Sequence, residues 1–527
     1  MIRGYTAQEV REAEQPLLSA GQPLMLRAAR ALADRVRERL EAGADGEPDS
    51  PEPHRETPVG PRVLVLAGRG SNGGDGLHAA AMLRRDGIAA EAIATADGVH
   101  AEGAAALRDA GGTIHSLAES SADDLRQVIA GAGLVLDAIL GIGGRPEIPA
   151  ALEPLLEAVR AEQVPVIAVD VPSFVDATSG RAAPGALAAS ETVTFGAVKA
   201  GLLLPGAAHL TGTLHPVDLG LGEHLPARPA AERLEDSDLR ALWPRPERDA
   251  TKYSRGVVAV VAGSPRFPGA AVLTCSGAAR AGAGMVRCVA PQSVLDLVLQ
   301  TRPEVVGQPT DTVDLEEIGR TDALVVGSGI GGEDPRARAG LDVLSHDIDH
   351  AGEHGKDRDG DGGAGGLERG VIDAGGLAAM TAEHRFGSDV VLTPHRGEAE
   401  RLADRLGIGT DLPGPELAAA LAGATGATVL LKGAVTLVAP GDGGPLRAQD
   451  DATSQLATAG TGDVLAGVIG TLLAAGLPGP DAAALGAMLH GRAGRLASRD
   501  GLRPLVALDV ADHLPAALGA ILAGALP

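Results

Sequence analysis

QLATAGTGDVLAG, residues 455–467, places a turn of small residues directly before Asp463 and the helix-like stretch 464–475. A tight turn at a helix start exposes unpaired backbone N–H groups, and the helix dipole there favours negative charge. The stretch therefore predicts an anion cradle at Gly460, Thr461 and Gly462. An acid beside such a cradle is a candidate acceptor for the proton of a hydroxyl that attacks a phosphate. For an isolated GTGD, a glycine turn followed by an N-cap aspartate would be the better interpretation.

The composition bounds the architecture and the partners. A chain of 527 residues is too long for one core and predicts two or three domains. Aromatic residues make up only 1%, which leaves almost no stacking platform for single-stranded nucleic acid. With 45 basic and 69 acidic residues, the chain is a poor partner for nucleic acid or an anionic membrane. Three of its four lysines, Lys199, Lys252 and Lys432, lie in the motifs described below.

The sequence also indicates a cytoplasmic protein. Two cysteines, Cys275 and Cys288, make neither a disulfide framework nor a metal cluster and fit a reducing compartment. The first twenty residues carry charges throughout and lack the apolar segment of a secretory signal. The longest apolar stretch, 464–477, is too short to span a bilayer and predicts a buried core helix.

Short β-branched runs alternate with helical Ala/Leu/Arg segments along most of the chain. This pattern predicts an α/β protein with parallel sheets that helices cover on both faces, and ligands beyond the carboxyl ends of the strands. Residues 41–61 and 345–370 are polar and rich in Gly, and we expect flexible insertions there. Residues 221–250, rich in Pro and charge, predict a linker. The expected strands are 62–67, 134–138, 164–170, 192–195, 257–262, 323–326, 371–373, 390–392 and 428–431.

A glycine-rich segment, GRGSNGGDG at 68–76, follows the first expected strand and precedes an expected helix at 77–85. Five glycines in nine positions allow the backbone to approach a phosphate and supply N–H donors at the helix start. The spacing is not the GxGxxG of dinucleotide-binding folds. A plain tight turn is the alternative interpretation.

Two acids end consecutive strands, Asp137 in LDAILGIGG (136–144) and Asp170 in VDVPS (169–173). We expect both to face one crevice, because the carboxyl ends of parallel strands meet at one edge. A lone acid at a strand end usually caps the following helix. Two acids, together with Asn72 and Ser173, would instead form an oxygen-lined pocket for a monovalent cation and leave one carboxylate for proton transfer.

SNGGDG, DAILGIGG, DVPS and TVTFGAVKAGL, in this order, resemble the YjeF N-terminal domain, the NAD(P)H-hydrate epimerase. The resemblance covers roughly residues 1–220, including a leading helix at 6–29. It implies K⁺ at Asn72, Asp137 and Ser173, and Asp170 as the acid/base at the reacting ring. The chain departs from the family at Ser71, where Asn is usual, and at Phe174, where Gly is usual. The implied substrate-binding residues are Ser71, Asn72, Gly73, Gly74, Asp75, Gly141, Ile142, Gly143, Gly144, Arg145 and Asp170.

The second half carries its own set of strand-to-loop motifs. In LTPHRGE (392–398), His395 and Glu398 are three apart and would face one way at a helix start, although a capping Thr393 with a first-turn Glu is nearly as good an interpretation. Lys432 leaves an expected strand at a tight hairpin. Such a lysine is usually a solvated edge residue, but GTGD some thirty residues on favours a place near the phosphate cradle.

YSRG, SGIGG, DAGGL, LTPHRGE, LLKGAVT and GTGDVLAG resemble the YjeF C-terminal domain, the ADP/ATP-dependent NAD(P)H-hydrate dehydratase. The resemblance spans roughly residues 235–527 and lacks the second acid of the usual DADAL at 373–377. It implies that Asp463 takes the hydroxyl proton and that Mg²⁺ bridges phosphate oxygens. The implied nucleotide-binding residues are Lys432, Gly433, Ala434, Val435, Thr436, Gly460, Thr461 and Gly462. The implied substrate-binding residues are Ala270, Gly329, Thr393, Pro394, His395, Arg396, Gly397, Glu398 and Asp463.

Together the two resemblances imply one repair enzyme with a Rossmann-like three-layer α/β/α domain followed by a ribokinase-like α/β domain. Its substrates would be the hydrated cofactors NADHX and NADPHX, with ADP or ATP as phosphoryl donor, and we expect a homo-oligomer. Two alternatives stay open. One is a small-molecule kinase of the ribokinase type, and the other is an active dehydratase whose N-terminal half is only a binding module.

Overall fold

The computed structural model describes residues 1–44, 62–310, 313, 315–345 and 367–524. They form two compact units, Arg3–Ala231 and Met1–Ile2 with Glu232–Pro527. The segment 221–250, expected to be a linker, contains η2 (Gly222–His224), β10 (Ala231–Arg233) and α8 (Asp236–Leu242). The expected insertions at 41–61 and 345–370 lie mostly outside the described residues.

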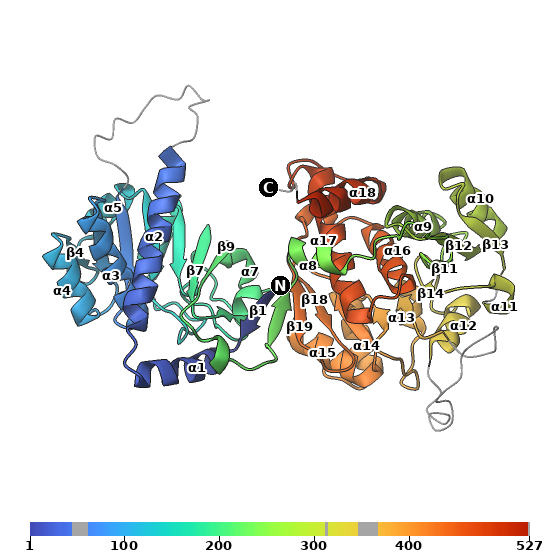
Figure 1. Ribbon diagram of the computed structural model, residues 1–527, viewed down its shortest axis with the longest axis horizontal. Helices are drawn as coiled ribbons and strands as arrows, with labels where there is room; N and C mark the ends of the chain where they lie inside the picture. The colour runs from blue at the N-terminus through green and yellow to red at the C-terminus, as the bar shows by residue number, and fades with distance from the viewer. Residues whose placement is uncertain (45–61, 311–312, 314, 346–366, 525–527) are drawn as a thin grey trace. The chain divides into compact units, whose positions relative to one another are not determined.

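The N-terminal unit, coloured blue to green in Figure 1, is built on seven parallel strands in the order β4-β3-β2-β5-β6-β7-β9. The strands are β2 (Val63–Ala67), β3 (Ala90–Ala94), β4 (Ile114–Ser116), β5 (Leu134–Ala138), β6 (Val166–Val169), β7 (Glu191–Phe195) and β9 (Thr213–Val217), and β1 (Ile2–Tyr5) pairs with β8 (Val198–Lys199). The helices are α1 (Ala7–Ser19), α2 (Leu24–Ala44), α3 (Ser71–Arg85), α4 (Ala101–Asp109), α5 (Ala122–Ala130), α6 (Glu153–Ala161), α7 (Ala208–Thr211) and η1 (Ala200–Leu203).

Helices cover both faces of this sheet. Successive residues of β2 point to opposite faces, and all of them are fully buried. The helix α3 packs on β2, β3 and β5, with α2 and α4 beside it. The chain order reverses after β4, so right-handed crossovers place α5 and α6 on the opposite face. The unit is a three-layer α/β/α structure.

Two expectations for the N-terminal unit are wrong in detail. The leading helix expected at 6–29 is two helices, because Gly21 adopts a left-handed φ of 73° and Pro23 follows it. The glycine-rich segment expected to be a loop up to residue 76 is already helical from Ser71. Gly73 and Gly76 serve close packing inside α3, since a Cβ at Gly73 would lie 1.9 Å from the carbonyl oxygen of Gly68.

The C-terminal unit has a longer mixed sheet, with strands in the order β13-β12-β11-β14-β15-β16-β17-β18-β19. Pairing is parallel up to β17 and antiparallel across β17-β18-β19. The strands are β11 (Val257–Val261), β12 (Met285–Ala290), β13 (Val306–Pro309), β14 (Ala323–Val326), β15 (Gly370–Ile372), β16 (Val390–Leu392), β17 (Thr428–Leu431), β18 (Thr436–Ala439) and β19 (Leu446–Gln449).

Helices again lie on both faces. The helices α9, α16 and α18 contact one another, and α16 packs on β11, β14 and β15. The helix α12 packs on β11 and β14, and α15 packs on β17 and β18. The helices are α9 (Gly269–Arg280), α10 (Gln292–Thr301), α11 (Leu315–Ile318), α12 (Pro335–Leu344), α13 (Ala374–Ala379), α14 (Arg396–Arg405), α15 (Gly414–Thr425), η4 (Ser454–Leu456), α16 (Thr461–Ala474), α17 (Gly479–Ser498) and α18 (Ala507–Ala523).

Small residues bring α9 and α16 into backbone contact. A Cβ at Gly277 would lie 2.2 Å from the carbonyl oxygen of Val464, and one at Gly467 would lie 2.1 Å from that of Thr274. This close packing fixes the first turn of α16, which carries Asp463, against the sheet. The predicted α/β class with helix-covered parallel sheets is confirmed. In the described part of the chain, the helices fall short of the length and apolarity that crossing a membrane requires.

Candidate active sites

A cavity of about 760 Å³ lies in the N-terminal unit, at the carboxyl ends of β2, β5 and β6. Its lining includes Ser71, Asn72, Asp75, Gly141, Ile142, Gly143, Gly144 and Asp170, all of them predicted site residues. Gly73 and Gly74 are buried inside α3, and Arg145 is exposed outside the lining. The strand-end loops therefore converge on one cavity, as the strand-and-glycine pattern predicts.

Asp170 is held at the cavity wall by a buried lysine that the sequence interpretation did not assign. The Nζ of Lys199 contacts Asp170 Oδ1, and it also donates to the carbonyl oxygen of Phe195 at 2.8 Å. The backbone N–H of Phe195 donates to the same carboxylate oxygen at 3.1 Å. Lys199 is 1% exposed, so the ion pair is shielded from water. The signal for it in the sequence was the scarcity of lysine together with its place in TVTFGAVKAGL.

Two more acids line the same cavity, Asp75 from the first turn of α3 and Glu14 from α1. Burial raises the pKa of Asp75 well above its usual value, and the charges of Asp170 and Glu14 raise it further while Lys199 opposes them. Burial also raises the pKa of Glu14. Glu14 was missed because an acid on an amphipathic helix normally belongs to its solvated face.

Of the predicted cation ligands, Asn72 lines this cavity, while Asp137 and Ser173 are hydrogen-bonded to each other and lie outside its lining. Ser173 donates to Asp137 from its backbone N–H at 2.9 Å and from its hydroxyl at 2.5 Å. A Cβ at Gly141 would lie 3.0 Å from Asn72 Oδ1, so the amide faces the same loop. Asp137 is fully buried and does not line the cavity, so the expectation that both strand-end acids face it is wrong. Amide, hydroxyl and carboxylate oxygens are donors suited to a hard cation.

In the C-terminal unit, the predicted cradle is the start of α16. Gly460 is the N-cap with a left-handed φ of 89°, and Asp463 lies in the first turn. Lys432 reaches the cradle, because a Cβ at Gly462 would lie 3.3 Å from its Nζ. Residues Lys432 to Val435 form the turn between the antiparallel strands β17 and β18, and Thr436 is the first residue of β18, as the hairpin interpretation predicts. The lysine is therefore not a solvated edge residue.

Asp373 joins the separate motifs of this site. Its carboxylate accepts hydrogen bonds from Thr393 Oγ1 at 2.9 Å and from Ser328 Oγ at 3.2 Å. Lys432 Nζ lies 3.1 Å from Asp373 Oδ1 and 3.9 Å from Glu398 Oε2. Four chain segments thus meet through one buried acid.

Asp463 itself has an unusual proton affinity. Burial raises the pKa of Asp463 from 3.8 to about 7, and the charge of Asp373 adds to the rise, whereas Ser328 and Lys432 oppose it. A carboxylate that titrates near neutral pH exchanges protons readily under ordinary conditions. This is the property that a proton acceptor for an attacking hydroxyl needs.

The LTPHRGE segment builds the start of α14. The N-cap is His395, not Thr393, since His395 Nδ1 accepts the N–H of Gly397 at 3.1 Å and Glu398 completes a capping box. Arg396 pairs with Glu400 at 2.6 Å along the helix surface. The structure also brings Ala270 and Gly329 together, since a Cβ at Gly329 would lie 2.4 Å from that of Ala270. Pro394 contacts the β17–β18 hairpin, because its carbonyl oxygen accepts a hydrogen bond from the backbone N–H of Lys432.

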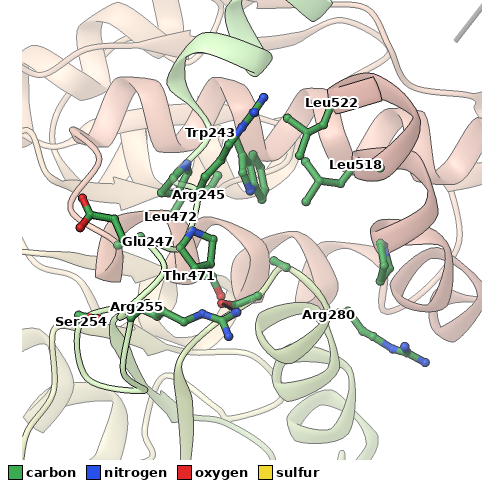
Figure 2. A pocket seen from close by; sticks show the side chains of 18 of the residues that line it. Trp243, Arg245, Glu247, Ser254, Arg255, Arg280, Thr471, Leu472, Leu518 and Leu522 are labelled. Carbon is green, nitrogen blue, oxygen red and sulfur yellow. Dashed lines mark hydrogen bonds between the residues drawn. The ribbon is translucent and has the colours of Figure 1, made fainter. Parts of the chain in front are cut away.

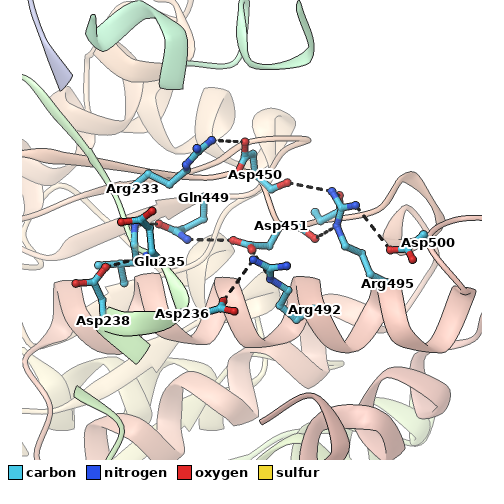
Figure 3. A network of polar contacts seen from close by, with 12 residues as sticks. Arg233, Glu235, Asp236, Asp238, Gln449, Asp450, Asp451, Arg492, Arg495 and Asp500 are labelled. Carbon is cyan, nitrogen blue, oxygen red and sulfur yellow. Dashed lines mark hydrogen bonds and ion pairs between the residues drawn. The ribbon is translucent and has the colours of Figure 1, made fainter. Parts of the chain in front are cut away.

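A polar network holds the loop that leads to the cradle (Figure 3). Arg492 Nε lies 2.7 Å from Asp451 Oδ1, and Arg495 Nε donates to the carbonyl oxygen of Asp451 at 2.7 Å. Burial raises the pKa of Asp451 to about 6. From the same helix, α17, the ring of His490 contacts the carbonyl oxygen of Thr461 at 3.0 Å, and burial lowers the pKa of His490 to about 4. Sequence interpretation missed this support, because its residues carry no motif.

A second cavity, of about 750 Å³, lies in the C-terminal unit (Figure 2). Its lining includes Trp243, Arg245, Arg255, Leu472, Leu518 and Leu522. It contains none of the predicted site residues. Its α16 residues are at the carboxyl end of that helix, whereas Asp463 is at the amino end. At about 1.5 Å per residue, the two ends are on the order of 15–20 Å apart.

Comparison with known proteins assigns the family. Residues 21–201 match the family described as YjeF-related protein N-terminus, and residues 258–516 match the NAD(P)H-hydrate dehydratase family. The bifunctional NAD(P)H-hydrate repair enzyme of Mycobacterium tuberculosis is 37% identical over 491 residues, 91% of either chain. That of Mycobacterium leprae is 37% identical over 530 residues, 98% of this chain and 99% of its own. The chain belongs to the family of bifunctional NAD(P)H-hydrate repair enzymes.

Solved structures are also similar to part of this chain. The ADP/ATP-dependent NAD(P)H-hydrate dehydratase of Bacillus subtilis, co-crystallised with ATP and Mg²⁺, covers 55% of this chain and 97% of its own. The identity is 26% and the TM-score 0.44.

Of the three departures from the repair-enzyme motifs, Phe174 has a structural explanation, and the DAGGL segment keeps the contacts of its first acid. Phe174 adopts a left-handed φ of 67°, the conformation that favours the glycine usual in the family, and its ring is buried against the cavity. The turn is therefore kept, and the ring takes up space in the pocket. In DAGGL, Ala374 has a φ of 40°, and the retained Asp373 makes the contacts described above.

Proposed function

We propose that the chain repairs hydrated NADH and NADPH with two separate sites. The N-terminal cavity interconverts the R and S hydrates, and the start of α16 dehydrates the S form at the expense of ADP or ATP. The observation that carries this proposal is the placement of Asp463, with a pKa of about 7, in the first turn behind a left-handed Gly460. A base and an anion cradle that lie this close together suit transfer of a phosphoryl group to a hydroxyl.

The dehydration has a simple chemical logic. The hydrate carries a hydroxyl on C6 of the nicotinamide ring, and hydroxide is a poor leaving group. Asp463 removes the proton of this hydroxyl as its oxygen attacks the terminal phosphate of the nucleotide. The N–H groups of the turn at Gly460 to Gly462 and the ammonium of Lys432 stabilise the charge on the transferred phosphoryl group. The lone pair of the ring nitrogen then expels phosphate, and loss of a ring proton restores the dihydronicotinamide.

Mg²⁺ fits this site as an ion held mainly by phosphate oxygens. Among the described residues, no group of three or more His, Cys, Asp or Glu side chains is arranged to hold a metal alone. Mg²⁺ commonly uses one or two carboxylates together with substrate phosphates, and when bound it neutralises phosphate charge. In the N-terminal unit, Asn72, Asp137 and Ser173 would hold K⁺, and the bound cation would order the loops around the substrate.

The test uses pure full-length protein, mixed hydrate epimers and either ADP or ATP, with absorbance reporting regenerated NADH or NADPH. Complete conversion requires both sites. A plateau after consumption of the S form alone would leave the N-terminal unit as a binding module. Accumulation of a stable phosphorylated alcohol, with no release of inorganic phosphate, would favour a small-molecule kinase instead.

A further inference from the structure

The cavity of the N-terminal unit holds three acids, of which only Asp170 has a buried cationic partner. Lys199 contacts Asp170 and two groups of β7, Phe195 O and Thr194 Oγ1. This contact is a buried ion pair, which loses much of its stabilisation when either partner is removed. Asp75 differs, because its Oδ1 is buried and has no hydrogen-bond partner among the described residues. The residue is 8% exposed and lines the cavity.

Epimerisation at C6 needs two proton-transfer groups. The stereocentre carries a hydroxyl and the ring nitrogen, so its configuration changes only when a bond at C6 breaks and forms again on the other side. Breaking the C6–O bond requires a proton on the departing oxygen. Adding water to the opposite face requires removal of a proton from that water. One ionised carboxylate does only the second task.

We propose that Asp75 is the proton donor of the epimerisation and that Lys199 is a positioning residue that fixes Asp170 as the proton acceptor. This inference rests on the proposed function of the N-terminal unit. It assigns opposite protonation states to two carboxyls of one cavity by their surroundings, since one faces a lysine and the other faces negative charge. Pairs of titratable groups in contrasting environments commonly mark the acid and the base of an active site.

The proton balance closes with water as the only co-reactant. Asp75 gives its proton to the C6 hydroxyl oxygen, the C6–O bond breaks with its electron pair on oxygen, and water leaves. The ring nitrogen supplies its lone pair to C6 and becomes positively charged. Water then adds to the other face of C6, its oxygen forms the new bond, and Asp170 takes the released proton. Transfer of this proton from Asp170 to Asp75 through water restores the starting state.

The surroundings of Asp75 support this assignment in geometry as well as in charge. The helix α3 is wedged against the sheet, since a Cβ at Gly76 would lie 2.8 Å from that of Ala138, so the acid is held on a rigid element. Burial raises the pKa of Asp75 well above its usual value, the charges of Asp170 and Glu14 raise it further, and Lys199 opposes them. Glu14 is only partly buried, and Arg11 and Lys199 act on it with the opposite sign.

The decisive experiment starts from the R hydrate alone, without nucleotide, and follows the S hydrate by chromatography, since the two are diastereomers. For Asp75→Asn we expect kcat to fall by about 100-fold or more, with KM changed by less than about threefold. The wild-type kcat should fall at alkaline pH, and this limb should be absent in Asp75→Asn. The matched control is Asp123→Asn, the same change in the exposed first turn of α5.

Two results overturn the proposal. One is Asp75→Asn with kcat within a few-fold of wild type, including the case in which Glu14→Gln loses activity instead. The other is a wild-type kcat without an alkaline limb, which decides the matter even if the variant does not fold. Failure of the wild-type protein to interconvert the hydrates at all would instead refute the proposed function.

Discussion

Asp463→Asn should stabilise the C-terminal unit while it abolishes the dehydration. The rise in the pKa of Asp463 from 3.8 to about 7 corresponds to about 4 kcal/mol at about 1.4 kcal/mol for each tenfold change in proton affinity. The folded state binds the proton more tightly than the unfolded state, so stability falls as pH rises from about 4 to about 7. Above that range the buried charge destabilises the folded unit. Asparagine has the same shape and carries no charge.

The figure of about 4 kcal/mol is an upper bound, because the carboxylate is partly exposed to water. We expect Asp463→Asn to raise the free energy of unfolding by about 1–2 kcal/mol at about pH 8. This corresponds to a rise in Tm of roughly 2–6 °C. The fluorescence of Trp243 reports the C-terminal unit selectively, because it is the single tryptophan of the chain and lies in that unit. At about pH 4 the difference between variant and wild type should shrink toward zero, because most Asp463 is then protonated in the folded state and a growing share in the unfolded state. Asp342→Asn, on the exposed surface of α12, is the control.

Two outcomes would refute this reasoning. A variant that is less stable than wild type at about pH 8 would mean that the attraction of the Lys432 charge outweighs the burial of Asp463. A variant that still regenerates NADH from the S hydrate would remove Asp463 as the proton acceptor.

Three further substitutions test the supporting groups. Lys199→Met should leave Asp170 without its partner, and so destabilise the N-terminal unit by about 3 kcal/mol and abolish epimerisation. Dehydration of the S hydrate by the other unit should continue, and an equal loss of both activities would contradict this prediction. Phe174→Gly should relieve about 1–2 kcal/mol of backbone strain but lose about 3–5 kcal/mol of ring packing, so chemical denaturation should show a net destabilisation of about 2 kcal/mol. Arg492→Ala should destabilise the C-terminal unit by about 3 kcal/mol at a pH above the Asp451 pKa of about 6, and by less below it, because losing the partner matters only when the carboxylate is charged. A loss of stability that does not change with pH, measured by Trp243 fluorescence during thermal unfolding, would refute this prediction.

Nine strands could be predicted from the sequence, because β-branched runs and glycine turns are local signals, but others, such as β3, β4, β12 and β13, were missed. The strands at 134–138, 323–326, 390–392 and 428–431 begin and end where expected. The start of α3 could not be predicted, because glycines normally end or precede helices. Only the tertiary contact of Gly73 with Gly68 shows why these glycines lie inside the helix. The break in the leading helix had a local signal in Gly21 and Pro23 that a long amphipathic pattern obscured.

The acids proposed to react could be chosen from motifs, but their partners could not. Asp463 and Asp170 follow strand or turn patterns that are visible in one stretch of sequence. Lys199 reaches Asp170 from 29 residues away, and Lys432 reaches Asp373 from 59 residues away. His490 and Arg492 support the cradle from a helix whose own sequence carries no motif. These contacts depend on which strands become neighbours, which no local pattern records.

The two sites use the scarce lysines in opposite ways, and this difference matches the chemistry proposed for each. In the N-terminal unit, Lys199 pairs with Asp170 alone, which leaves Asp75 without a cationic partner and able to hold a proton. In the C-terminal unit, Lys432 lies between Asp373 and Glu398, and Asp463 is left to titrate near neutral pH. An epimerisation that ends with the same proton count needs a donor and an acceptor at once. A phosphoryl transfer needs one base and a cation near the phosphate, and a chain of net charge −24 supplies that cation locally because its overall field cannot attract an anion.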